Sequence, residues 1–189
     1  MSSKKNKEAI TLNDLIEKIK LKSHEVFDFW GTSSFGWAPN SVANKLSTAR
    51  LDWLKELTDC LDIWESKFPL LTNGELLLAC ANLGALVEGW LKLFYCVYYE
   101  DYLRNPIKLR GQLIEPNDMS FERLKQFSRG ILWAQSSDWD NWIDKIQRKR
   151  NGIHAFNNRD IETSDEFIDD IIRFDEFIDV VDCRLPYPN

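Results

Sequence analysis

One segment constrains the fold more than any other, the apolar run LLLACANLGALVEGWLKLFYCVYY at residues 76–99. It is nearly long and apolar enough to span a bilayer, but Asn82, Glu88 and Lys92 lie in its middle. Glu88 and Lys92 are spaced i,i+4 and are expected to pair on one helical face. One such segment in an otherwise charged chain is typical of a buried helix. The sequence therefore predicts the central core helix of a soluble bundle, and no membrane span.

The size and composition of the chain suit one folded unit. A chain of 189 residues with 44% hydrophobic residues and eight tryptophans can bury a sizeable core, so we expect a single domain over residues 1–189. Residues 1–10 carry positive charge without an apolar run behind it, which predicts a short flexible tail rather than a secretory signal. The cysteines are far apart and show no zinc-binding spacing, which predicts reduced thiols in a cytoplasmic protein: Cys60, Cys80, Cys96 and Cys183.

Charge is distributed unevenly along the chain. The net charge of −6 argues against a dedicated nucleic-acid-binding domain, which usually carries a basic excess. Residues 160–182 contain ten acidic residues and one basic residue, whereas residues 145–150 hold four basic side chains in six positions. An acidic tail beside a basic patch can lower RNA affinity or complete an interface. A solvated outer helix face explains the same pattern equally well.

Helical periodicity extends over most of the chain, and no alternating run is long enough to indicate a sheet. Ser137 opens a segment with Asp138 and Asp140 in its first turn and basic residues near its end, the charge order that complements the helix dipole. Between the first two helices, residues 30–41 are expected to form a loop packed by aromatic side chains. The sequence predicts an all-α bundle of about five or six helices. The expected helices cover residues 11–29, 41–68, 73–99, 120–135, 137–156 and 163–182.

The helix expected over residues 137–156 places two polar side chains on its apolar face. At roughly 100° per residue, Arg150 and His154 lie within the apolar seam, whereas Arg148 points into solvent. Asn151 flanks the seam, and Gly152 weakens the helix by about 1 kcal/mol relative to alanine. The seam itself consists of Trp139, Ile143, Ile146 and Ile153.

An arginine in an apolar seam is costly unless it is paired or the seam opens onto a cleft or a partner. One explanation is structural: Arg150 pairs with Glu88 or a carboxylate of the C-terminal helix, and His154 caps a helix end. The other explanation is chemical. Histidine can take a proton from a ribose 2′-hydroxyl or give one to the leaving 5′-oxygen, and the arginine fork can hold the phosphate. A two-fold dimer would bring two such pairs to one cleft, which predicts an RNase without a metal or another cofactor.

The stretch RKRNGIHAF, in which Arg-Asn is followed by a short gap, histidine and an aromatic residue, resembles the HEPN superfamily. These helical domains are common in prokaryotic toxin–antitoxin and antiphage systems. Their hallmark is an arginine, four to six residues of any type, and a histidine, often with a polar residue after the arginine. The resemblance implies a dimeric, metal-independent endoribonuclease with an RNA substrate and an antitoxin or defence protein as partner.

Carried over to this chain, the resemblance makes His154 the general acid–base and Asn151 the polar residue after the arginine. Arg150 leaves three residues before His154, whereas Arg148 leaves five and satisfies the hallmark spacing. Helix geometry favours Arg150, which we take as the first choice, with Arg148 in reserve. Phe156 stands where one HEPN subfamily has a tyrosine that can be modified, so that mode of silencing is not expected here.

Two other interpretations remain open. The chain could be a non-catalytic helical binding module that keeps the HEPN shape, or a core protein in which Arg150 simply pairs with Glu88; fold does not determine function. His24, the second histidine, lies among charged residues and is expected to be at the surface or half-buried. No phosphate-binding G-x-x-x-x-G-K-[ST] loop, zinc-protease H-E-x-x-H motif or hydrolase G-x-S-x-G motif occurs.

Overall fold

The all-α class predicted from the sequence is confirmed. The computed structural model describes residues 11–33, 36–154, 161 and 163–188, and these residues form a helical bundle with one two-stranded hairpin. The expectations for residues 1–10, Phe35 and Phe156 concern residues outside this description.

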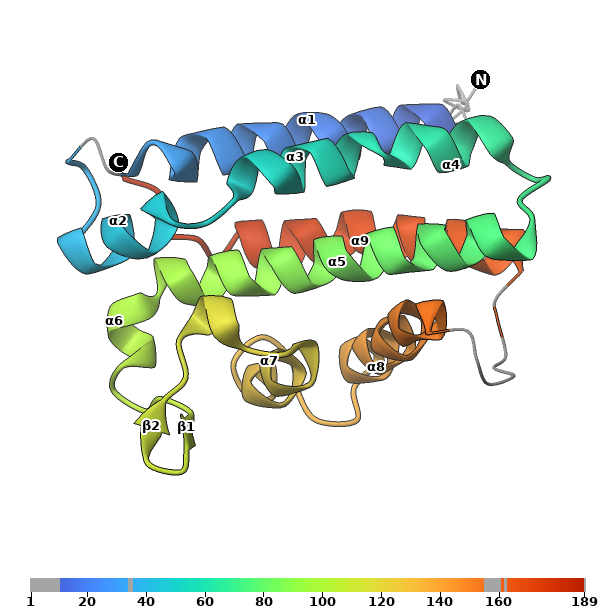
Figure 1. Ribbon diagram of the computed structural model, residues 1–189. Coiled ribbons are helices and arrows are strands. Elements are labelled where there is room, and N and C mark those ends of the chain that lie inside the picture. Colours follow the sequence, from blue (N-terminus) through green and yellow to red (C-terminus); the bar gives the residue numbers. More distant parts are fainter. Residues whose placement is uncertain (1–10, 34–35, 155–160, 162, 189) are drawn as a thin grey trace, which may run out of the picture.

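The bundle has three layers, visible in Figure 1. Helix α1 (Leu12–Gly31) forms the first layer together with α3 (Leu51–Asp59) and α4 (Leu61–Lys67). Helices α5 (Asn73–Val97) and α9 (Ser164–Asp182) lie side by side in the middle. On the other side, α7 (Phe121–Ser128) and α8 (Asp138–Arg150) pack against α5, and α2 (Asn40–Ser47) and α6 (Tyr99–Tyr102) close one end.

Helix α5 is the core helix that its sequence predicts. Among the described residues it is the one helix long and apolar enough to cross a membrane, but 72% of its most apolar window is buried inside the bundle. This burial is that of a core helix in a soluble domain. The sequence suggests Asn73 as the cap of this helix, but the N-cap is the residue before it, Thr72. The Thr72 hydroxyl accepts from the Glu75 N–H at 3.3 Å, and the Glu75 carboxylate accepts from the Thr72 N–H at 2.9 Å.

The second expected helix, residues 41–68, is wrong as a single helix. The chain leaves the helical path after Ser47, because the Ser47 and Thr48 hydroxyls donate to the Asn44 and Lys45 carbonyl oxygens of the last turn. It turns at Arg50 and continues as α3 and α4, which meet at Cys60.

The helix expected over residues 120–135 is also too long. Ser120 caps its start as predicted, but α7 ends at Ser128. Gly130 has a φ of +80°, a conformation that ends helices and that glycine adopts without steric cost. The following residues turn toward the start of α8.

Two aromatic and loop regions differ in detail from expectation. Trp30 belongs to the last turn of α1 rather than to a loop, and its buried ring packs 5.1 Å from that of Trp37. Strands β1 (Lys108–Leu109) and β2 (Gln112–Leu113) form an antiparallel hairpin in a region expected to be a loop. Both turn residues, Arg110 and Gly111, have positive φ, the geometry of a tight hairpin turn, and strands this short leave no alternating pattern. A 3-10 turn, η2 (Pro116–Asp118), then contacts α5.

The C-terminal helix α9 carries a stripe of apolar residues at helical spacing. Thr163 caps it through a reciprocal pair of hydrogen bonds with Glu166. The residues of the stripe are all buried: Phe167, Ile171, Phe174, Ile178 and Val181.

Candidate functional site

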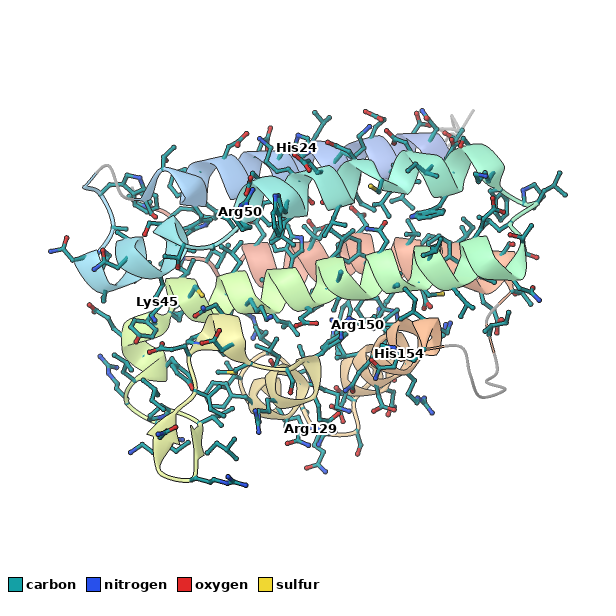
Figure 2. All side chains as sticks on the ribbon, viewed as in Figure 1. His24, Lys45, Arg50, Arg129, Arg150 and His154 are labelled. Atoms are coloured by element: carbon teal, nitrogen blue, oxygen red, sulfur yellow. The ribbon has the colours of Figure 1, made fainter. Side chains whose placement is uncertain are left out.

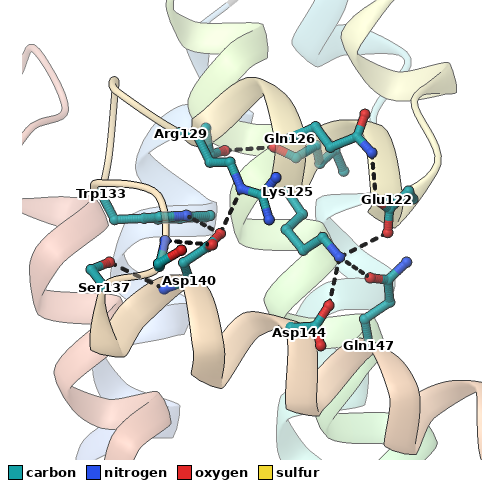
Figure 3. Close-up of polar contacts among 12 residues, drawn as sticks. Glu122, Lys125, Gln126, Arg129, Trp133, Ser137, Asp140, Asp144 and Gln147 are labelled. Atoms are coloured by element: carbon teal, nitrogen blue, oxygen red, sulfur yellow. Dashed lines mark hydrogen bonds and ion pairs between the residues drawn. The ribbon is translucent and has the colours of Figure 1, made fainter.

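The start of α8, the helix that carries the candidate site, is fixed by a buried carboxylate. Asp140 accepts hydrogen bonds from Arg129 Nε at 2.8 Å, Trp133 Nε1 at 3.2 Å and the Ser136 N–H at 2.9 Å (Figure 3). The Arg129 guanidinium lowers the pKa of Asp140, so this carboxylate is ionised at neutral pH. Ser137 caps the helix by accepting from the Asp140 N–H, as its sequence predicts.

A second cluster joins α8 to α7. The Lys125 ammonium lies 2.7 Å from Asp144 Oδ1, 2.9 Å from Gln147 Oε1 and 2.9 Å from Glu122 Oε2 (Figure 3). The Lys125 side chain is only 6% exposed, and a buried charge needs partners within the protein. The carboxylates of Asp144 and Glu122 compensate it.

Two of the four basic residues at the end of α8 are engaged by α9. Lys145 and Lys149 lie 2.8 and 2.9 Å from the two carboxylate oxygens of Asp170, which is 2% exposed. Trp142 Nε1 also donates to Asp170, at 3.0 Å. These contacts hold the middle and end of α8 against α9.

Helix α8 ends at Arg150, six residues earlier than expected. A 3-10 turn, η3 (Asn151–Ile153), follows. Its buried Gly152 packs against Leu77 of α5, whose side chain an added Cβ would approach to 3.2 Å. The predicted apolar seam is therefore confirmed for Ile143 and Ile146, which are buried, and is wrong for Ile153, which is 44% exposed.

Arg150 lies against α5, as its place in the apolar seam requires. Its stem packs on Gly84, where an added Cβ would come within 2.5 Å of the Arg150 Cβ. Its Nη2 lies 2.8 Å from Glu88 Oε2, and Lys92 Nζ lies 2.9 Å from Glu88 Oε1. The Glu88 side chain is 11% exposed and the Arg150 side chain 36%. Arg150 is thus the positive partner of a nearly buried carboxylate, the structural explanation that its sequence position left open.

The other candidate residues lie closer to solvent. The Arg148 side chain is 73% exposed and lies 3.2 Å from the Asp144 carboxylate, one turn earlier on α8. Half-buried Asn151 ends the helix, and its carbonyl accepts from the His154 N–H at 3.3 Å. His154 is exposed just past η3 (Figure 2), and within the described part of the chain its imidazole has no hydrogen-bond or ion-pair partner. Because the helix ends at Arg150, His154 does not share a helical face with it.

The second histidine has a structural partner. His24 is half-buried on α1, as expected, and its Nε2 lies 2.9 Å from Asp59 Oδ1 of α3. This contact ties two helices of the first layer together, far from the end of α8 (Figure 2).

A groove between α3 and α5 was not foreseen from the sequence. We call it the α3–α5 groove; its volume is about 300 Å³, and Arg50, Lys92, Arg150 and Glu88 are its charged lining residues. The spacing of Glu88 and Lys92 predicted their ion pair but did not indicate the groove, whose walls come from segments distant in the sequence.

Burial raises the pKa of Cys96, which also lines the groove, to about 12, so this cysteine is an unreactive thiol at neutral pH.

The comparisons with protein-family models, with curated proteins and with solved structures found no match. Within the described residues, no group of three or more His, Cys, Asp or Glu side chains is placed to hold a metal ion.

The two candidate arginines should respond differently to mutation. Arg150→Ala removes one of the two cations on nearly buried Glu88 and the stem that packs on Gly84, so we expect the free energy of unfolding to fall by about 1–3 kcal/mol. Arg148→Ala removes only an exposed ion pair and should change it by less than about 0.5 kcal/mol. Urea denaturation of both variants beside the wild type measures the difference. Equal effects would contradict the structural role assigned to Arg150.

Proposed function

We propose that the chain is a HEPN-like helical domain that cleaves RNA without a metal, in a site formed by two copies of the chain. The supporting observation is the exposed imidazole of His154, just beyond the end of α8, with exposed Arg148 upstream and five residues between them, which is the hallmark spacing. The imidazole is free to approach a substrate, because it is not engaged by another described side chain.

The proposed chemistry divides between two residue types. His154 takes the proton from the ribose 2′-hydroxyl and returns a proton to the leaving 5′-oxygen. Arg148 holds the phosphate whose negative charge grows in the transition state. A single histidine is poorly suited to both proton transfers, because one step needs a proton acceptor and the other a proton donor. A two-fold dimer supplies two histidines. In this proposal the protein acts in the cytoplasm as a toxin or antiphage effector, with an antitoxin or defence protein as its partner.

Arg150 and Asn151 take positioning roles in this proposal. The Arg150–Glu88 pair fixes the last turn of α8 on α5, and Asn151 begins the turn that carries His154 out into solvent. Because Arg150 is paired with Glu88 and Arg148 is exposed, the proposal gives the phosphate contact to Arg148, the choice from family spacing, rather than to Arg150, the first choice from helix geometry.

The test is cleavage of an end-labelled RNA by the purified protein in EDTA. The proposal expects fragments that end in a 2′,3′-cyclic phosphate. Such fragments lack a free 3′-hydroxyl, so a polymerase cannot add nucleotides to the 3′ end until the cyclic phosphate is removed. An absence of cleavage, or cleavage that appears only when magnesium is restored, would contradict it.

A second candidate is a non-catalytic binding module, and one observation favours it. All four basic residues at the end of α8 are paired with carboxylates of the same chain, which leaves less charge for RNA phosphates than the sequence suggests. On this alternative, His154→Ala alters self-association, measured by light scattering, and wild type shows no nuclease activity. A variant that associates like wild type would count against the alternative.

A further inference from the structure

The α3–α5 groove combines an apolar floor with a cationic margin. Its walls are leucines of α2, α3 and α5, and they enclose about 300 Å³, at the lower end of the roughly 300–1,000 Å³ typical of small-molecule sites. It extends along α5 from Ala85 to Cys96, eleven residue steps or about 16 Å of helix. The apolar side chains named here are Leu46, Leu51, Leu54, Leu57 and Leu93.

The charged groups of the groove do not balance. Its lining has three cations, Arg50, Lys92 and Arg150, and one carboxylate, Glu88. Asp52 pairs with Arg50 beside the groove, so an excess of one positive charge remains. Lys92 and Arg150 converge on the two oxygens of Glu88, at 2.9 and 2.8 Å. Lysine has three N–H donors and arginine five, so both cations keep donors for a further anion. Their side chains are 30% and 36% exposed, which leaves them accessible from solvent.

We propose that the α3–α5 groove binds a single-chain acyl carboxylate, with its hydrocarbon chain along the leucines and its carboxylate beside Lys92 and Arg150. Besides its charged residues, the lining has one amide, Asn117, and is otherwise mostly apolar, which suits an unsubstituted hydrocarbon chain better than a nucleobase or a sugar. Charge complementarity then selects an anionic head group. The groove shares the Arg150–Glu88 pair with the positioning contact proposed above, but it does not include Arg148 or His154, the residues proposed to touch RNA. Binding of an acyl carboxylate can therefore fail or succeed whether or not the chain cleaves RNA.

Arg50 gives the groove a second cationic contact at the start of α3. Its guanidinium stacks 3.8 Å over the ring of Trp53, which is 55% exposed, and its Nε donates to Asp52 at 2.9 Å. Stacking and the ion pair hold this side chain at the groove. Because Asp52 offsets its charge, the attraction for an acyl carboxylate comes mainly from Lys92 and Arg150.

The test is calorimetric titration of the full chain with dodecanoate, below its micelle-forming concentration. We expect saturable binding with one ligand per chain, and no saturable binding of dodecyltrimethylammonium. The comparison is stringent, since the net charge of −6 attracts the cationic amphiphile and repels dodecanoate at long range. Preference for the anion therefore reports the local charge of the groove.

Two variants separate the groove from non-specific binding. Lys92→Gln should weaken dodecanoate binding at least about fivefold, because a charge-assisted hydrogen bond is lost while Arg150 still pairs with Glu88. Lys55→Gln is the matched control, because this substitution also removes one positive charge from the region. The Lys55 side chain does not line the groove and pairs with Asp28 of α1. Lys55→Gln should bind like wild type. Equal binding by Lys92→Gln and wild type, or equal binding of both amphiphiles, would overturn the proposal.

Discussion

Replacement of His154 by alanine is expected to lower the rate of RNA cleavage by a factor of roughly 100 to 10,000, the usual effect of losing a general acid–base group. This factor corresponds to about 3–5 kcal/mol of transition-state stabilisation. The His154 side chain is exposed and lies beyond the last helical turn, so its loss should leave the free energy of unfolding within about 0.5 kcal/mol of wild type. The measurement is single-turnover cleavage of an end-labelled RNA in EDTA.

The control for this variant is His24→Ala, which removes the other histidine. His24 contacts Asp59 within the first layer and has no part in the proposed site, so its variant should cleave RNA at the wild-type rate. The two proteins are purified in parallel, because a contaminating nuclease would act in both. Equal cleavage by His154→Ala and His24→Ala would remove His154 from the mechanism.

The arginines allow the same experiment to assign the phosphate contact. Arg148→Ala should slow cleavage at unchanged stability, since its side chain is 73% exposed. Arg150→Ala should lower stability, and any loss of rate should follow from the displaced end of α8. A normal rate with Arg148→Ala would return the phosphate-binding role to Arg150.

Helix starts were predictable because they depend on short local patterns. Thr11, Ser120, Ser137 and Thr163 each cap a helix where the sequence places its beginning, and the side-chain oxygen accepts from a backbone N–H three residues later. Helix ends were less predictable. The breaks after Ser47 and Ser128 occur where side-chain hydrogen bonds and a positive-φ glycine end the helix, and α8 ends two residues before Gly152. Hydrophobic periodicity reports none of these local features.

The candidate site was predictable only in part, for the same reason. The apolar seam of α8 and the i,i+4 spacing of Glu88 and Lys92 indicated a possible Arg150–Glu88 pair, which the structure contains. The position of His154 depends on where α8 ends. The prediction was wrong because it extended the helix to residue 156, whereas α8 ends at Arg150. The α3–α5 groove joins residues about 100 positions apart in the sequence, such as Arg50 and Arg150, and no local pattern connects them.

Asp170→Ala is expected to lower the free energy of unfolding by about 3–5 kcal/mol, the cost of breaking a buried charged pair by removing one partner. Asp170 is 2% exposed and accepts hydrogen bonds from Trp142, Lys145 and Lys149. Without it, two ammonium groups and an indole N–H lose the carboxylate that joins α8 to α9. Urea denaturation followed by circular dichroism and extrapolated to water measures the change.

Two variants make this expectation specific. Asp169→Ala removes the same side chain from the adjacent, exposed position and should change stability by less than about 0.5 kcal/mol. Asp170→Asn keeps an acceptor for Trp142 but removes the charge that Lys145 and Lys149 face. Its free energy of unfolding should therefore lie between those of Asp170→Ala and Asp169→Ala. If Asp170→Ala were as stable as Asp169→Ala, the basic end of α8 would not be held by α9.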